Sequence, residues 1–247
     1  MRKVLLLFLC IFWGASLFAQ APLKRPTKAK PQKAQVANPQ SQPAKPKQTR
    51  GTINGHEWVD LGLPSGVKWA TCNVGANSPE DYGDYFAWGE IEPKNNYSWS
   101  TYKYCKGTDK TLTKYCTNSS YGIVDNMRNL ESADDIAHAR WGGSWRMPTS
   151  NELDELENEC TWTWIMQNGV KGRKVTGPNG NSIFLPAAGS RYNSELCDVG
   201  IYGNYWSSSL GFDDYPDNAC RLYIDSEQYG YGYFSKEVGY SVRAVVR

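Results

Sequence analysis

Tyrosines gather near the C-terminus in a pattern that suits molecular contact. Residues 192–240 hold nine of the sixteen tyrosines, where an even spread would place about three. Tyr229, Tyr231 and Tyr233 alternate with glycine, so on a strand the three rings would share one face. Such rings beside small polar residues predict a contact surface, or alternatively a ladder packed inside the domain. The predicted ligand-binding site consists of Tyr229, Tyr231, Tyr233, Tyr215, Asp213 and Asp214.

Residue types needed for catalysis are scarce in this chain. His56 and His138 are its two histidines, and no Ser/His/Asp or Cys/His arrangement is evident around either. Two acidic pairs resemble paired carboxylates, although nothing near them suggests a raised pKa: Glu90 with Glu92, and Asp134 with Asp135. We therefore assign no catalytic residue, and the sequence favours a binding protein over an enzyme.

One acidic stretch offers oxygen atoms of the kind that calcium binds. Its members are Asp213, Asp214, Asp217 and Asn218. The alternative is an acidic surface loop without a metal, which we favour. We therefore predict no metal site and no cofactor, and calcium is left as a possibility without support.

Six cysteines follow the first 21 residues, at positions 72, 105, 116, 160, 197 and 220. Cys105 and Cys116 bracket a short polar loop, so we expect these two to form a disulfide. The remaining candidate pairs are Cys197 with Cys220 and Cys72 with Cys160. The alternative is that some remain buried thiols, because free cysteine packs as a small hydrophobic residue. None of the six has the C-x-x-C spacing of a zinc site.

Short strands and two helices are predicted to position these residues. Alternation predicts strands over residues 57–61 and 67–72, and helical spacing predicts a helix over residues 132–141. Thr149 and Glu152 form a capping box that predicts a second helix over residues 150–160. Further strands are expected over residues 170–176, 182–185, 205–209, 220–224 and 241–246. Early helices followed by mixed strands make α+β the expected class.

Four sequence blocks, which together cover about residues 56–247, resemble the FISUMP (major paralogous domain) family. They are Val59–Ala70, Trp141–Glu152 with its R-M-P-T-x-x-E core, Tyr205–Ser209 with Y-W-S-S, and Gly239–Val245 with G-x-x-V-R-x-V. The resemblance implies a C-type-lectin-like fold, related to formylglycine-generating-enzyme-like domains and to variable proteins of diversity-generating retroelements. It also implies that the strand over residues 57–61 pairs with the strand over residues 241–246, and that a long loop region projects from one end.

The activities of the wider fold find little support in these residues. Calcium-dependent sugar binding would use Glu-Pro-Asn or Gln-Pro-Asp with Trp-Asn-Asp, whereas Glu92-Pro93-Lys94 places a cation there and Trp-Asn-Asp does not occur. Formylglycine-type oxidation would need two reactive cysteines, for which Cys197 and Cys220 are the candidates. A structural disulfide is the simpler expectation for that pair.

The N-terminal residues differ sharply in composition from the rest. Residues 1–21 begin with basic residues, continue through an apolar run and end in Ala19-Gln20-Ala21, which predicts a secretory signal peptide. Residues 22–50 hold six prolines, eight basic residues and no acid, which predicts a disordered linker, either a tether or a basic arm touching the cell envelope. Residues 51–247 hold 17 basic and 25 acidic residues, a net charge of −8 that argues against nucleic acid.

These observations combine into one main hypothesis and two alternatives. The chain is expected to be exported to the periplasm, the cell surface or the extracellular space, where residues 51–247 bind a protein or a glycan through the C-terminal loop region. The first alternative is a structural or adhesive surface protein without a single small ligand. The second is a relative of the formylglycine-generating oxidases.

Overall fold

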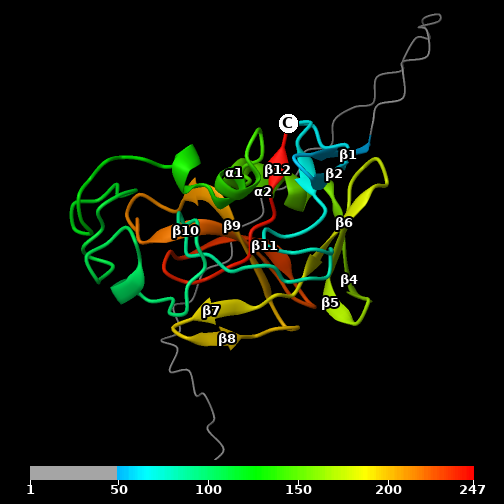
Figure 1. Ribbon diagram of the computed structural model, residues 1–247. Coiled ribbons are helices and arrows are strands. Elements are labelled where there is room, and N and C mark those ends of the chain that lie inside the picture. Colours follow the sequence, from blue (N-terminus) through cyan, green and yellow to red (C-terminus); the bar gives the residue numbers. More distant parts are fainter. Residues whose placement is uncertain (1–48) are drawn as a thin grey trace, which may run out of the picture. The chain divides into compact units, whose positions relative to one another are not determined.

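A computed structural model describes residues 49–247, and the predicted signal peptide and nearly all of the predicted linker lie outside the described residues. Two α-helices and four antiparallel sheets make this a mixed, strand-rich domain, as the expected α+β class requires (Figure 1). The helices are α1 (Ile136–Trp141) and α2 (Ser150–Glu159). None of the helices in this part is long and apolar enough to span a membrane.

The first sheet has the strand order β1-β2-β3-β12. Its strands are β1 (Arg50–Ile53), β2 (His56–Asp60), β3 (Lys68–Ala70) and β12 (Val245–Val246). Asn54 and Gly55, with φ of 50° and 83°, form the tight turn between β1 and β2. The sequence contained that Asn-Gly signal, but β1 was not among the predicted strands.

The predicted pairing of the first predicted strand with the closing strand is wrong. β12 pairs with β3, and β3 stands between β12 and β2. The physical reason is that β1 and β3, the neighbours of β2 in sequence, occupy both of its edges. Only the outer edge of β3 is left for a strand that arrives from the far end of the chain.

Arg243 fixes the closing segment against the chain that follows β3. Its side chain is 1% exposed, and its guanidinium donates to Asn73 Oδ1 at 2.9 Å and to the carbonyl oxygen of Thr71 at 2.9 Å. Backbone bonds join Ala70 to Ala244 and Val74 to Val242. The arginine of the V-R-x-V block is therefore a buried structural side chain.

Both predicted helices are present, and the first is interrupted. A 3-10 turn, η2 (Ser132–Asp134), precedes α1, because Asp135 leaves the helical conformation and caps α1 by accepting from the N–H groups of Ala137 and His138. α2 begins where the capping box predicted, since Thr149 accepts from the N–H of Glu152 and Glu152 reaches back to Thr149. It ends one residue before the predicted Cys160.

A three-stranded meander follows α2, with strand order β4-β5-β6. β5 (Val170–Thr176) and β6 (Ser182–Pro186) match the predicted strands closely, but β4 (Thr161–Gln167) was missed. Asn168-Gly169, with φ of 47° and 84°, is a second Asn-Gly turn and joins β4 to β5. This turn and the alternating Thr-Trp-Thr-Trp were the signals that could have revealed β4.

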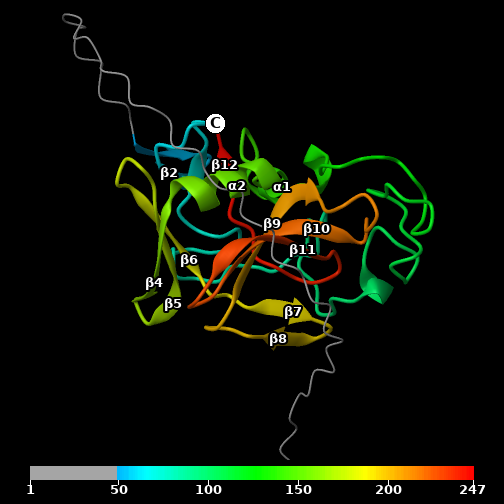
Figure 2. The same cartoon turned by 180° about the vertical axis from the view of Figure 1, so that it is seen from behind.

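The sheet that carries the predicted site has the order β11-β10-β9, which makes β11 an edge strand. Its strands are β9 (Gly203–Leu210), β10 (Asn218–Ile224) and β11 (Tyr229–Ser235). A short hairpin of β7 (Ser190–Tyr192) and β8 (Glu195–Cys197) lies at the end of the domain opposite the helices (Figures 1 and 2).

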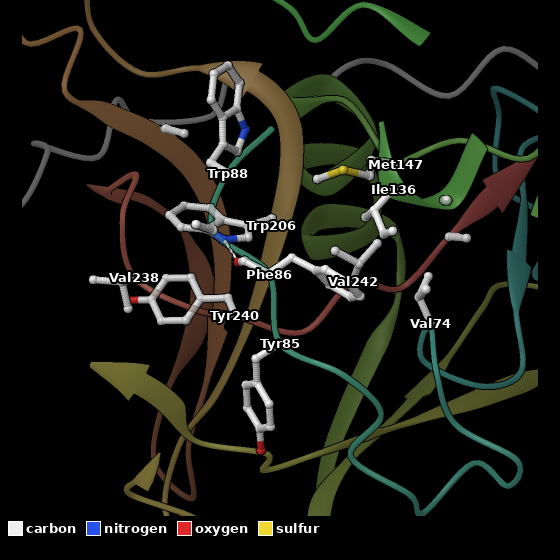
Figure 3. Packing of buried hydrophobic residues seen from close by; sticks show 14 of the residues in the cluster. Val74, Tyr85, Phe86, Trp88, Ile136, Met147, Trp206, Val238, Tyr240 and Val242 are labelled. Atoms are coloured by element: carbon white, nitrogen blue, oxygen red, sulfur yellow. Dashed lines mark hydrogen bonds between the residues drawn. The ribbon is translucent and has the colours of Figure 1, made fainter. Parts of the chain in front are cut away.

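Two hydrophobic clusters cover the two faces of the β9–β10–β11 sheet. Trp206, Tyr240 and Trp88 belong to the larger cluster (Figure 3). This cluster also contains Trp145. The Trp206 indole N–H donates to the carbonyl oxygen of Phe86 at 2.9 Å. Trp145, which follows the Gly142-Gly143 turn, is fully buried, and its indole N–H donates to the carbonyl oxygen of Ile53 at 3.0 Å.

The second cluster fills the opposite face of that sheet and reaches α2. Tyr205, Leu222 and Ile224 contribute from the sheet, and Leu153 and Leu156 contribute from α2. The central sheet is therefore a layer between two cores, and only its β11 edge reaches the outside.

Candidate functional site

The three alternating tyrosines lie along β11 and share one face, as the sequence predicted. Tyr229 is opposite Ile224, Tyr231 opposite Leu222, and Tyr233 opposite Cys220. Because those three partners on β10 are buried in the second cluster, the tyrosines stand on the core side of the sheet, at its edge. The glycines between them face the other way, where Gly232 lies beside the ring of Tyr223.

The three rings differ in their surroundings. Tyr229 stacks on Trp162 with ring centres 4.6 Å apart and an interplanar angle of 15°. Tyr233 contacts Phe212 with ring centres 4.2 Å apart. Tyr231 stands between them and is 40% exposed. The row is therefore neither a free surface nor a buried ladder, since its ends pack and its middle faces solvent.

The other predicted site residues lie on the loop between β9 and β10. Tyr215 is 57% exposed. The two terminal guanidinium nitrogens of Arg128 donate to the Asp213 carboxylate, and the Asp213 carbonyl oxygen accepts from the Thr117 hydroxyl at 2.8 Å. The loop meets β11 through Phe212, so the structure brings it to the Tyr233 end of the row. Asp214 is exposed and its neighbour Asp213 is already paired with a cation.

Two acids on α2 give the row a negative border. Glu157 Oε2 accepts from the backbone N–H of Tyr231 at 3.1 Å, and Asp154 lies one helical turn earlier. Burial raises the pKa of Glu157, with the nearby Asp154 charge adding to the effect. Burial and the same two carboxylates raise the pKa of the Tyr231 hydroxyl, which stays neutral. No local sequence pattern indicates that Asp154 and Glu157 belong to this site, because their proximity to β11 depends on helix packing.

The turn at Gly142-Gly143, which precedes α2, borders a cavity of about 430 Å³ beside α1. Gly142 and Gly143, with φ of 65° and 59°, allow the turn that shapes its rim. Most of its lining side chains are polar: Asn129, Ser132, Asp135, His138, Ser144, Arg146, Thr149 and Ser208. Their main polar groups are used within the fold, since Asp135 caps α1 and Arg146 forms a two-point ion pair with Glu152. A second cavity, of about 370 Å³, lies between β1 and the β4–β6 meander. Neither cavity contains a predicted site residue.

No disulfide joins any two cysteines of residues 49–247, so the expected Cys105–Cys116 bond is absent from the structure. The two thiols are directed to different carbonyl groups: Cys105 Sγ donates to Trp99 O at 3.0 Å and Cys116 Sγ to Asn118 O at 3.2 Å. The other expected pairs, Cys197 with Cys220 and Cys72 with Cys160, are likewise not bonded to each other. The short spacing of Cys105 and Cys116 in the sequence does not show that their thiols point to different carbonyl groups.

Cys160 and Cys220 also lack the environment of a reactive cysteine. Burial raises the pKa of Cys220 to about 11 and that of Cys160 to about 12. Reactive cysteines show the opposite shift, because the thiolate is the nucleophile. The candidate pair for oxidation, Cys197 and Cys220, is divided between the β7–β8 hairpin and the buried β10.

The histidines and the paired carboxylates have structural surroundings. His56 stacks on Trp141 with ring centres 3.9 Å apart, and burial lowers its pKa. Glu90 binds Lys94 at 2.9 Å. Within the described residues no three His, Cys, Asp or Glu side chains gather as a metal site.

A buried polar network near Trp88 was not found from the sequence. Lys236 is fully buried, donates to Tyr115 O at 2.9 Å and lies 4.8 Å from the centre of the Trp88 ring. Burial lowers its pKa to about 7, although Cys116, Asp217 and Asp125 favour the charged form. The local sequence does not indicate this burial, because the neighbouring residues Ser235 and Glu237 suggest a surface turn. Lys236 is buried by the packing of distant segments.

Asp134 forms the other half of that network. It accepts from Tyr104, from Tyr115 at 2.7 Å and from Lys114 at 2.6 Å. Burial alone would raise its pKa, but these three donors outweigh burial and hold the pKa at about 2. The carboxylate is therefore satisfied and charged, unlike a general acid.

Comparison of the chain with family models, with curated proteins and with solved structures finds no match.

Proposed function

We propose that residues 51–247 form a non-enzymatic binding module that recognises an extracellular protein or glycan through the edge of β11 and the adjoining loop. The observation that carries this proposal is the exposure of large aromatic side chains there. Phe212 is 58% exposed, Tyr215 57% and Tyr231 40%. Aromatic side chains supply much of the energy of protein contacts, and gathered exposure of this kind is typical of interaction sites.

The sequence resemblance supports the same proposal. The FISUMP blocks would assign the chain to the C-type-lectin-like fold, in which a loop region at one end serves recognition. The proposed setting is the periplasm, the cell surface or the extracellular space, reached through the signal peptide over residues 1–21. The basic linker would then tether the module or touch the envelope.

A structural or adhesive role is the second candidate, and the β7–β8 region favours it. Five large apolar side chains are exposed within eleven residues: Tyr192, Leu196, Val199, Ile201 and Tyr202. Exposed apolar side chains gathered on one short segment suit association between protein surfaces. The oxidase alternative has the least support, since burial raises the pKa of Cys220.

The test is a variant with serine at Tyr229, Tyr231 and Tyr233, with Tyr192→Ser as the exposed control. Arrays of glycans and surface proteins are read with and without a calcium chelator, after melting has shown that each variant is folded. We expect the triple variant to lose its ligands and the control to keep them. A folded triple variant that retains every ligand would overturn the proposal. Glycan binding that disappears with the chelator would identify a calcium-dependent lectin.

A further inference from the structure

We infer that the outer edge of β11 accepts an extended, lysine- or arginine-bearing peptide strand of a partner protein, which extends the β9–β10–β11 sheet. This inference rests on the proposed function and specifies the ligand of the same site. It predicts backbone pairing along the edge, together with contacts from basic side chains to the tyrosines and acids beside it.

The backbone of β11 presents unused hydrogen-bonding groups on that edge. In an antiparallel pair, alternate residues point their N–H and C=O groups away from the partner strand. The bond from the Tyr231 N–H to Glu157 Oε2 shows that Tyr231 is one of the outward residues. Tyr229 and Tyr233 share its phase, and their outward groups have no backbone partner within residues 49–247.

The sequence of β11 lacks the residues that usually protect an edge strand, although α2 lies beside the strand. Edge strands are commonly guarded by lysine, proline or a bulge. β11 reads Tyr-Gly-Tyr-Gly-Tyr-Phe-Ser, without lysine or proline, and pairs with β10 in continuous register from Tyr229 to Ser235. The Glu157 carboxylate accepts from the outward Tyr231 N–H. A basic side chain of the ligand can form an ion pair with this carboxylate, either in place or after drawing it away from the N–H.

The charge beside the edge favours a cationic ligand. Asp154 and Glu157 stand on the α2 side of Tyr231, and neither forms an ion pair with a cation of the described residues. Residues 51–247 as a whole carry a net charge of −8. A lysine or arginine brought to this edge therefore gains an attraction that a neutral glycan or an acidic peptide would not.

The spacing of the rings suits a strand as the ligand. Alternate residues of a strand are about 6.8 Å apart, so alternate side chains of an added strand meet Tyr229, Tyr231 and Tyr233 in step. The exposed face of Tyr231 can support the aliphatic part of a lysine and hold its ammonium group by cation–π attraction. The ammonium group then lies within reach of Asp154 or Glu157.

The probe is a blocked eight-residue peptide in which lysine alternates with threonine, titrated into the full chain at low salt. One control peptide carries glutamate in place of lysine, and a second has every backbone nitrogen methylated. We expect binding of the lysine peptide alone, because the first control reverses the charge and the second cannot donate backbone hydrogen bonds. Equal binding of the methylated peptide would overturn strand addition.

The matched protein variants are Asp154→Asn with Glu157→Gln, which keeps an acceptor for the Tyr231 N–H, and Glu195→Gln on β8 as control. The double variant should bind the peptide about tenfold more weakly, and the control should bind it unchanged. Unchanged binding by the double variant would overturn the role of charge. If the lysine peptide fails to bind while the tyrosine triple variant still loses its array ligands, this inference is wrong and the proposed function stands.

Discussion

Tyrosine has one role in the interior of the domain and a different role at the β11 edge. Tyr97, Tyr102 and Tyr205 are at most 3% exposed, and each hydroxyl donates to a backbone carbonyl at 2.5–2.9 Å. Tyr231 and Tyr233 are more exposed, and their hydroxyls form no hydrogen bond within the described part of the chain. The interior rings therefore join backbone segments, whereas the edge rings leave a polar end available to a ligand.

This difference shows why the tyrosine count alone did not locate a site. Of the nine tyrosines in residues 192–240, Tyr205 and Tyr240 are buried in different clusters. A buried tyrosine must satisfy its hydroxyl inside the protein, because an unpaired buried polar group costs free energy. Tyr205 meets this requirement by donating to the Pro186 carbonyl oxygen, which marks it as a structural tyrosine in a way that composition does not.

The largest expected effect contrasts Tyr205→Ala with Tyr231→Ala. Removing the Tyr205 ring leaves a cavity and removes the hydroxyl bond to the Pro186 carbonyl oxygen, so the free energy of unfolding should fall by about 3–5 kcal/mol. Removing the exposed Tyr231 ring should change it by only about 0.5 kcal/mol. Urea denaturation of the two variants measures both values. Similar losses of unfolding free energy in the two variants would contradict the distinction between interior and edge tyrosines.

The next effect concerns the buried ammonium group of Lys236. The pKa of Lys236 is about 7 in the folded protein, whereas the ordinary pKa of lysine, which applies to the unfolded chain, is 10.5. Between these pH values the unfolded chain therefore binds more protons than the folded protein. The free energy of unfolding should therefore rise with pH, by about 2 kcal/mol from pH 7 to pH 9. Lys236→Met should remove this rise, and Lys171→Met, at an exposed position, should preserve it. Denaturation at several pH values decides, and an unchanged slope in Lys236→Met would contradict the assignment.

An effect of similar size is expected at Asp134, but at acid pH. Because its folded pKa of about 2 lies below the ordinary 3.8, its stabilisation is present at neutral pH and is lost as the pH falls from about 4 to 2. Asp134→Asn should lower the free energy of unfolding by about 2 kcal/mol at pH 7. Glu131→Gln is the matched control, since Glu131 binds the same Lys114 but is exposed. Equal losses in both variants would refute a special role for the buried carboxylate.

The smallest effect belongs to the capping box, which lies outside both tyrosine groups. Thr149→Ala removes the acceptor for the Glu152 N–H and should cost about 1 kcal/mol of unfolding free energy. Thr149→Ser keeps that acceptor and should cost much less. Both variants should leave peptide binding at β11 unchanged. They therefore show whether a loss of stability by itself weakens peptide binding at the edge. A binding loss in Thr149→Ala would link the edge to the start of α2.

Short-range patterns in the sequence determined a large part of this fold. The capping box at Thr149 placed the start of α2, and alternation placed the tyrosines of β11 on one face. Two Asn-Gly pairs, Asn54-Gly55 and Asn168-Gly169, form the β1–β2 and β4–β5 turns, although β1 and β4 were not predicted. Such features depend on residues a few positions apart, so local stereochemistry decides them.

Tertiary structure alone decided the features that join distant segments. It placed β12 on β3 instead of β2, buried Lys236 against Trp88, directed Cys105 and Cys116 to different carbonyls, and brought Glu157 to the edge of β11. Each outcome depends on which edges and cavities remain after neighbouring segments have packed. The sequence by itself determined the chemistry of the tyrosine row and its shared face, and packing determined which of those rings a ligand can reach.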